Sequence, residues 1–157
     1  PVELGGHEAY ATRLLPGESM ADYYVQFHEL DAIEMFQMDE KGILGVPKIV
    51  VPLEEGRLTK TPEQLGIDTV ILENIPQNSV TLASTVNDMS VTVDLGDFPY
   101  LGMWTMDGQE DALYLCIEPW TALPDGHFIP RELGERPGVL TLGSGESKSL
   151  AYRMTFA

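Results

Sequence analysis

The chain has 157 residues, 43% of them hydrophobic, and its 25 acidic and 9 basic side chains give a formal net charge of -16. This length and composition suffice for a hydrophobic core without disulfides, but the charge excludes a nucleic-acid-binding protein, which needs a basic surface. No Lys or Arg occurs between Thr61 and Pro130, so anionic membranes and polyphosphates are also poor partners for this stretch.

Apolar and polar residues alternate with a period of two along most of the chain, which predicts β-strands. In chain order, the expected strands cover residues 23–27, 33–37, 49–53, 69–72, 80–84, 89–95, 100–105, 112–118 and 149–156. Turn residues such as Asn87-Asp88 and Asp107-Gly108 separate the strands. This pattern predicts a single all-β unit over residues 1–157, an antiparallel β-sandwich or barrel.

The alternation of residues in two of these expected strands predicts which side chains share a face of a sheet. In the strand at 112–118, one face carries Leu113, Leu115 and Ile117 and the other carries Tyr114, Cys116 and Glu118. In the strand at 149–156, Leu150, Tyr152, Met154 and Phe156 share a face.

Helix signals are few. Thr61-Pro62-Glu63-Gln64 has an N-cap threonine, a proline at the first helical position and a capping-box glutamine. Gly66 would end the helix after one or two turns.

Cys116 is the single cysteine, so no intramolecular disulfide can form, which fits a reducing compartment. His7, His28 and His127 are scattered, and we expect neither a metal site nor a cofactor. The sequence shows no apolar run that could span a bilayer and no leader-like N-terminus. We therefore expect a cytoplasmic protein, and, because the chain opens abruptly at Pro1, a piece of a longer polypeptide.

Three residues are candidates for chemistry, each with a plainer alternative. His7 follows two glycines that can present it at a loop mouth, although a lone histidine is more often a surface or structural residue. Glu118 ends an apolar strand beside Pro119 and Trp120; it is either a desolvated carboxylate next to an aromatic platform or a strand-end carboxylate facing water. Asp68 begins another strand and could be a simple turn acid.

Four blocks of sequence resemble the aldose 1-epimerases, and among them the bacterial LacX-like branch. The blocks are Leu4-Gly5-Gly6-His7-Glu8-Ala9-Tyr10, Asp22-Tyr23-Tyr24-Val25-Gln26-Phe27, Asp97-Phe98-Pro99-Tyr100-Leu101-Gly102-Met103-Trp104-Thr105 and Cys116-Ile117-Glu118-Pro119-Trp120. The resemblance covers the whole chain but only about the C-terminal half of the family's domain. It implies the fold of that family, the galactose mutarotase-like antiparallel supersandwich.

The resemblance also implies a function. The family interconverts the α and β anomers of a free aldose, with a base at the C1 hydroxyl and an acid at the ring oxygen. By position in the motifs, Glu118 would be the general base and His7 the general acid, while Asp68 would bind sugar hydroxyls. The flat apolar ring of Trp120 is of a kind that can stack on a sugar ring.

Two departures from the family qualify this assignment. The Arg and the second His that the family's N-terminal half supplies are not in this chain, so we expect activity to require that half. After Gly-Gly-His, Glu8 and Ala11 replace the usual residues. The alternative function is a sugar-binding module that keeps the fold without catalysis.

Overall fold

The computed structural model describes residues 2–3, 5–6, 8–11, 16–65, 68–106 and 114–157, and the side chains of these except 8–11, 46–47 and 63. The strands are β1 (Glu8–Ala11), β2 (Tyr23–Phe27), β3 (Ala32–Met38), β4 (Leu44–Pro52), β5 (Arg57–Leu58), β6 (Thr69–Glu73), β7 (Ser79–Ser84), β8 (Ser90–Asp94), β9 (Tyr100–Trp104), β10 (Tyr114–Trp120) and β11 (Arg153–Phe156). Short 3-10 helices cover Met20–Asp22, Glu63–Leu65, Pro76–Asn78 and Leu133–Glu135.

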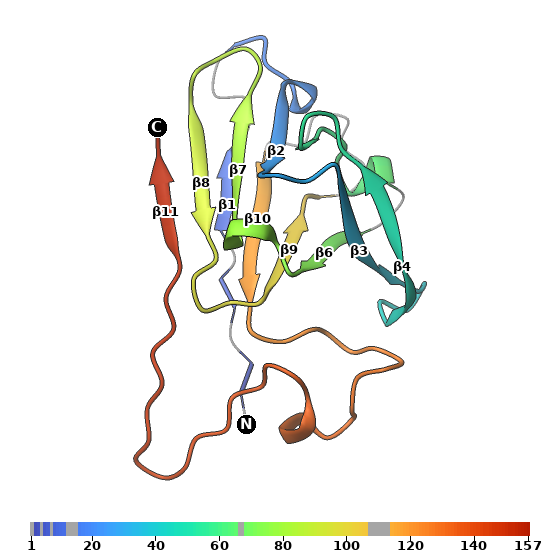
Figure 1. Cartoon of the computed structure of the whole chain (residues 1–157), viewed down its shortest axis with the longest axis vertical. Coiled ribbons are helices and arrows are strands. Elements are labelled where there is room, and N and C mark those ends of the chain that lie inside the picture. The colour runs from blue at the N-terminus through green and yellow to red at the C-terminus, as the bar shows by residue number, and fades with distance from the viewer. Residues whose placement is uncertain (1, 4, 7, 12–15, 66–67, 107–113) are drawn as a thin grey trace.

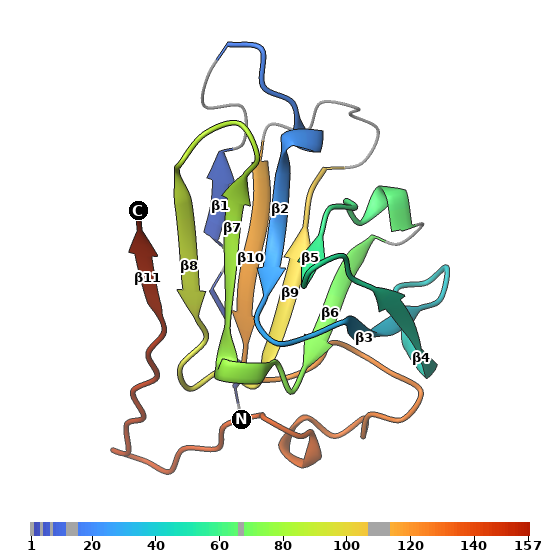
Figure 2. The same ribbon diagram turned by 45° about the horizontal axis from the view of Figure 1, so that its top comes forward.

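The strands form two antiparallel sheets that pack face to face. One sheet has the order β1-β10-β9-β6-β3-β4 and the other β11-β8-β7-β2-β5. β4 and β11 lie at opposite sides of the molecule (Figure 1). Figure 2 shows β7 and β2 in front of β10 and β9, so the two sheets form the layers of a sandwich. The predicted all-β antiparallel sandwich is confirmed.

The main hydrophobic core fills the space between the two sheets, because alternate residues of each strand point inward. Its largest fully buried side chains include Phe27, Met35, Leu72, Leu95, Leu101 and Ile117. Burial of this apolar surface is the main source of stability for the sandwich.

A second apolar cluster covers the other face of the six-stranded sheet. Ile71 belongs to it, whereas its neighbours in β6, Val70 and Leu72, belong to the main core. Phe36 of β3, Leu44 of β4 and Leu123, from the segment that follows β10, are the other buried members of this cluster. This face of the sheet is thus partly covered, and the candidate site lies on it.

Each predicted strand overlaps an observed one; β2 has the predicted bounds, and the largest differences are in β4 and β11. β4 begins at Leu44, five residues before the predicted start, and includes Pro47. Proline argues against a central strand, but β4 is an edge strand, where a missing N–H is tolerated. β1 and β5 were not predicted, because four and two residues are too short to show a period.

β11 begins at Arg153, so the prediction of a strand over 149–152 is wrong. Ala151 instead exchanges hydrogen bonds with Asp97, donating its N–H to Oδ2 (2.9 Å) and accepting the Asp97 N–H (3.1 Å). Tyr152 still packs against the core, but Met154 and Phe156 are exposed because β11 is the last strand of its sheet.

The helix expected after Thr61 is a single 3-10 turn, Glu63–Leu65. Its capping box is present: Gln64 donates its N–H to Thr61 Oγ1 (3.2 Å), and Gln64 Oε1 accepts the N–H of Thr61 (2.9 Å). Gly66, like the Asp107-Gly108 turn and Leu113, lies outside the described residues. Among the residues that are described, no helix is long and apolar enough to cross a membrane.

Candidate functional site

Glu118 lies in β10, between β1 and β9, on the face of the sheet that points away from the main core. The predicted alternation is confirmed here, since Leu115 and Ile117 lie in the core while Cys116 and Glu118 point to the opposite side. Only 6% of Glu118 is exposed. Its interpretation as a strand-end carboxylate facing water is therefore wrong.

The Trp120 side chain holds the Glu118 carboxylate. Trp120 Nε1 donates a hydrogen bond to Glu118 Oε2 at 3.2 Å. The indole lies against two glycines: a Cβ at Gly102 would come within 2.5 Å of Trp120 Cζ2, and one at Gly5 within 2.8 Å of Cδ1. Gly102 pairs with Glu118 across β9 and β10, and Gly5 bridges Trp120. Glycine at both positions is what lets the ring lie flat against the backbone.

A cleft of about 340 Å³ lies beside the Glu118 carboxylate and the Trp120 ring. Glu118 and Trp120 line it together with Gly5 and Gly6. Clefts of several hundred Å³ with a few polar groups are typical of small-molecule sites. A buried carboxylate at such a cleft can accept hydrogen bonds or act as a general base.

His7 lies outside the described residues, so its side chain is not placed. Its chain neighbours are placed beside β10. Gly6 donates its N–H to the carbonyl of Pro119 (2.9 Å), and Glu8 pairs with Ile117. The residues on both sides of His7 in sequence therefore follow the strand that carries Glu118.

Asp68 precedes β6 and is exposed, and its Oδ2 accepts a hydrogen bond from Thr69 Oγ1 (2.8 Å). It lines a second cleft, of about 670 Å³, to which Trp120 and Pro124 also contribute. Because the same two residues line the cleft at Glu118, the structure places Asp68 and Glu118 in adjoining clefts.

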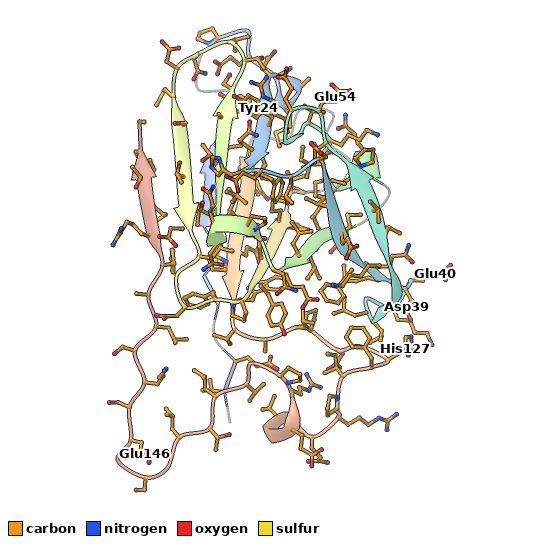
Figure 3. The ribbon with its side chains drawn as sticks, in the orientation of Figure 1. Tyr24, Asp39, Glu40, Glu54, His127 and Glu146 are labelled. Atoms are coloured by element: carbon orange, nitrogen blue, oxygen red, sulfur yellow. The ribbon has the colours of Figure 1, made fainter. Side chains whose placement is uncertain are left out.

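Two acidic residues that line the second cleft were not predicted from the sequence. Asp39 and Glu40 line it from the turn between β3 and β4. His127 lies beside them, with Nε2 at 3.3 Å from Asp39 Oδ2 (Figure 3). The turn-like composition of Asp39-Glu40-Lys41-Gly42 was the available signal, but it does not indicate what the turn faces.

Electrostatics keep the Cys116 thiol neutral. Burial and, to a smaller extent, the charge of Glu118 together raise the pKa of Cys116 to about 11. A neutral thiol is a poor nucleophile, so this cysteine is not suited to nucleophilic catalysis. Within the described ranges, no group of three or more His, Cys, Asp or Glu side chains could hold a metal ion.

Comparison with known proteins identifies relatives of this chain. No family model matches it. It is 26% identical over 157 residues to the chromosomal and plasmid forms of Protein LacX of Lactococcus lactis subsp. lactis, covering 99% of this chain and 52% of each relative. The chain thus spans about half the length of the curated relatives it matches.

Solved structures show the same relationship. A galactose mutarotase related enzyme from Lactobacillus acidophilus has a TM-score of 0.82 and 23% identity, covering 99% of this chain and 51% of that one. A galactose mutarotase-like protein from Lactobacillus casei has a TM-score of 0.77 and 30% identity, covering 99% and 53%. The resemblance indicated by the four sequence blocks is confirmed: this chain has the galactose mutarotase-like fold and is related to the LacX proteins over about half their length.

Proposed function

We propose that this chain is the C-terminal half of an aldose 1-epimerase that interconverts the α and β anomers of a free, unphosphorylated aldose. The observation that carries the proposal is the Glu118 carboxylate, which is 6% exposed, hydrogen-bonded to Trp120 and open to a cleft of about 340 Å³. The similarity to LacX and to galactose mutarotase-like structures supports it.

The reaction needs one base and one acid. Glu118 accepts the proton of the C1 hydroxyl, while His7 donates a proton to the ring oxygen, so that the C1–O5 bond breaks and an open-chain aldehyde forms. Rotation about the C1–C2 bond presents the other face of the aldehyde. The C5 hydroxyl then attacks C1, returns its proton to His7, and C1–O⁻ recovers a proton from Glu118.

The reference pKa values of these side-chain types suit the roles. A carboxyl group near 4.3 and an imidazole near 6.5 allow an ionised base and a partly protonated acid at about neutral pH. The placement of Gly6 and Glu8 along β10 supports His7 as the partner of Glu118. Each well-placed group of this kind typically contributes roughly 10²–10⁴-fold to the rate.

The other assigned residues bind the sugar. Asp68 accepts hydrogen bonds from sugar hydroxyls, and the Trp120 ring offers an apolar face to the ring carbons. Neither Lys nor Arg occurs among the described residues that line the two clefts. That lining favours a neutral sugar over a sugar phosphate, which needs a basic partner.

Catalysis requires the N-terminal half of the same domain, because the Arg and second His of the family's motifs are not in this chain. The lack of these motif residues also motivates the second candidate function, a module that binds a sugar without converting it. Both candidates use the cleft at Glu118 and differ only in whether the bound sugar reacts.

Two measurements on the full-length protein separate them. Polarimetry on fresh α-D-glucose and α-D-galactose should show mutarotation that increases linearly with protein concentration. Titration calorimetry should show saturable binding of the same sugars. Binding without accelerated mutarotation would support the module, and the absence of both would contradict either function.

A further inference from the structure

The six-stranded sheet is open between β3 and β6. These two strands are neighbours in the sheet, but they pair only at Met35 and Leu72, whereas β6 pairs with β9 along its whole length. Past this single pair, residues 32–34 of β3 and residues 73–74 at the end of β6 line a cavity of about 310 Å³. Its described lining residues line neither of the two clefts discussed above, so it is a separate cavity.

The inner wall of this β3–β6 cavity is apolar. Phe27, Ile33 and Leu72 line it, and all three belong to the main core. Leu30 and Ile75 also line it and are partly buried against the same core. Such a wall favours a ligand with a hydrocarbon body, because binding removes apolar surface from water.

Charged side chains surround the mouth of the cavity. Glu34 and Asn74 line it and are exposed, so the cavity opens to solvent there. Lys48 of β4 donates a hydrogen bond to Glu73 Oε1 (2.5 Å), and its ammonium group lies 4.4 Å from the centre of the Phe36 ring. The positive charge therefore already has two partners. The Glu34 carboxylate has neither a hydrogen-bond nor an ion-pair partner among the described residues, so the unpaired charge at the mouth is negative.

These features favour a cation with an apolar body over other ligands. An anion would compete with Glu73 for Lys48 and would lie close to the Glu34 carboxylate. A metal ion fits poorly, since the described part of the chain has no group of three or more His, Cys, Asp or Glu that could hold one. A primary amine with about seven non-hydrogen atoms needs roughly 210 Å³ if each atom takes about the 30 Å³ of a liquid water, so it fits a cavity of this size.

We propose that the β3–β6 cavity binds a small primary amine with an apolar body. The ammonium group pairs with Glu34 at the mouth, and the hydrocarbon body lies against Phe27, Ile33 and Leu72. This site is independent of the proposed epimerase function, because it shares none of its described lining residues with the cleft at Glu118.

The test compares three ligands that share a six-carbon chain and differ in the head group: hexylamine, hexanol and hexanoate. Amide NMR titrations of the full-length protein near neutral pH measure their affinities and locate the site. Hexylamine should bind about fivefold more tightly than hexanol, as expected for one partly exposed ion pair. Hexanoate should bind most weakly. The largest shifts should lie in β3 and at the end of β6, and saturating glucose should not displace the amine.

Glu34→Gln keeps the shape of the side chain and removes its charge. It should reduce the affinity for hexylamine to that for hexanol, and leave the affinity for hexanol unchanged. Glu54→Gln is the matched control, because Glu54 is also exposed and does not line the cavity. This variant should keep the full preference for the amine.

Three results would overturn the proposal. Tighter binding of hexanoate than of hexylamine would assign the mouth to Lys48 instead of Glu34. A preference for hexylamine that survives Glu34→Gln, or shifts centred on Glu118, would place the amine elsewhere. Absence of binding by all three ligands would show that the cavity takes no such molecule. None of these results affects the epimerase assignment, which polarimetry with glucose tests separately.

Discussion

Trp120 Nε1 donates a hydrogen bond to Glu118 Oε2 at 3.2 Å, and the two residues stand two positions apart on the same face of β10. The same indole fills the space above Gly102. The orientation of the buried carboxylate therefore depends on a ring whose own position depends on a glycine in the neighbouring strand.

Gly102→Ala tests this dependence. The added Cβ would come within 2.5 Å of Trp120 Cζ2, so the indole must move and its hydrogen bond to Glu118 must break or lengthen. We expect the free energy of unfolding to fall by about 1–3 kcal/mol, with a shift of tryptophan fluorescence and reduced sugar binding in the full-length protein.

Gly45→Ala is the matched control for this substitution. Gly45 also lies in a strand, β4, and a Cβ there would meet no atom within 4 Å. Its effect on stability should stay within about 0.5 kcal/mol. Equal effects of the two substitutions would show that the contact between Gly102 and Trp120 does not position the ring.

The Cys116 thiol should be inert in the native protein. With its pKa raised to about 11 by burial and then by the charge of Glu118, almost no thiolate exists at pH 8. Alkylation by iodoacetamide should be on the order of 10² times slower in the folded than in the unfolded protein. Comparable rates in both states would contradict the burial of this side chain.

The raised pKa of Cys116 also affects how the stability of the protein depends on pH. A thiol whose pKa is higher in the folded than in the unfolded state favours folding below the unfolded value, and this contribution is lost as pH rises through the folded value. Stability should therefore decline between about pH 9 and 11 in the wild type. Cys116→Ser has no thiol to titrate there, so its decline over this window should be smaller.

Local alternation was sufficient to predict much of the sandwich. β2 was predicted with its observed bounds, and the division of β10 into core and site faces was correct because one face is buried and the period of a strand is two. The bounds of β4 and β11 depend on which strands lie at the sheet edges. Edge position follows from the tertiary arrangement, which periodicity does not encode.

Some residues of the candidate site could be predicted from the sequence, and others could not. Glu118 and Trp120 are neighbours in sequence, so their motif revealed them together. Asp39 and His127 stand 88 residues apart, and only the packing of the segment after β10 against the β3–β4 turn makes them neighbours. Long-range contacts of this kind leave no local pattern in one sequence.

The turn at Asp39 should be resistant to acid. Hydrogen bonds from the backbone of Ile43 and Lys41 lower the Asp39 pKa below its usual value, so the ionised form holds the turn. For a lowered carboxyl pKa, the stabilising contribution is present above the unfolded value and is lost only as pH falls through the folded value.

Backbone NMR can follow this titration. The amide resonances of Lys41 and Ile43 should titrate with a midpoint below about 3.9, the reference value of an aspartate. In Asp39→Asn they should show no such titration. A wild-type midpoint at or above the reference value would contradict the hydrogen bonds seen here.

Gly96 should be essential for attaching the C-terminal segment. Its φ is +55°, and a Cβ there would meet the carbonyl oxygen of Ala151 at 2.1 Å. Gly96→Ala should destabilise the protein by about 1–3 kcal/mol and increase hydrogen exchange at Asp97 and Ala151. Gly134→Ala, where a Cβ meets nothing within 4 Å, should change neither quantity.

The central claim is that Glu118 is the base of an anomer-interconverting site, and Glu118→Gln tests it most directly. The substitution keeps the shape and the acceptor for Trp120 Nε1 but removes the basic carboxylate, whereas Glu54→Gln makes the same chemical change at an exposed site. Exchange NMR on the full-length protein with glucose measures the α–β interconversion rate. The account predicts a loss of about 10²–10⁴-fold for Glu118→Gln and none for Glu54→Gln, with both variants folded. An unchanged catalysed rate in Glu118→Gln would contradict it.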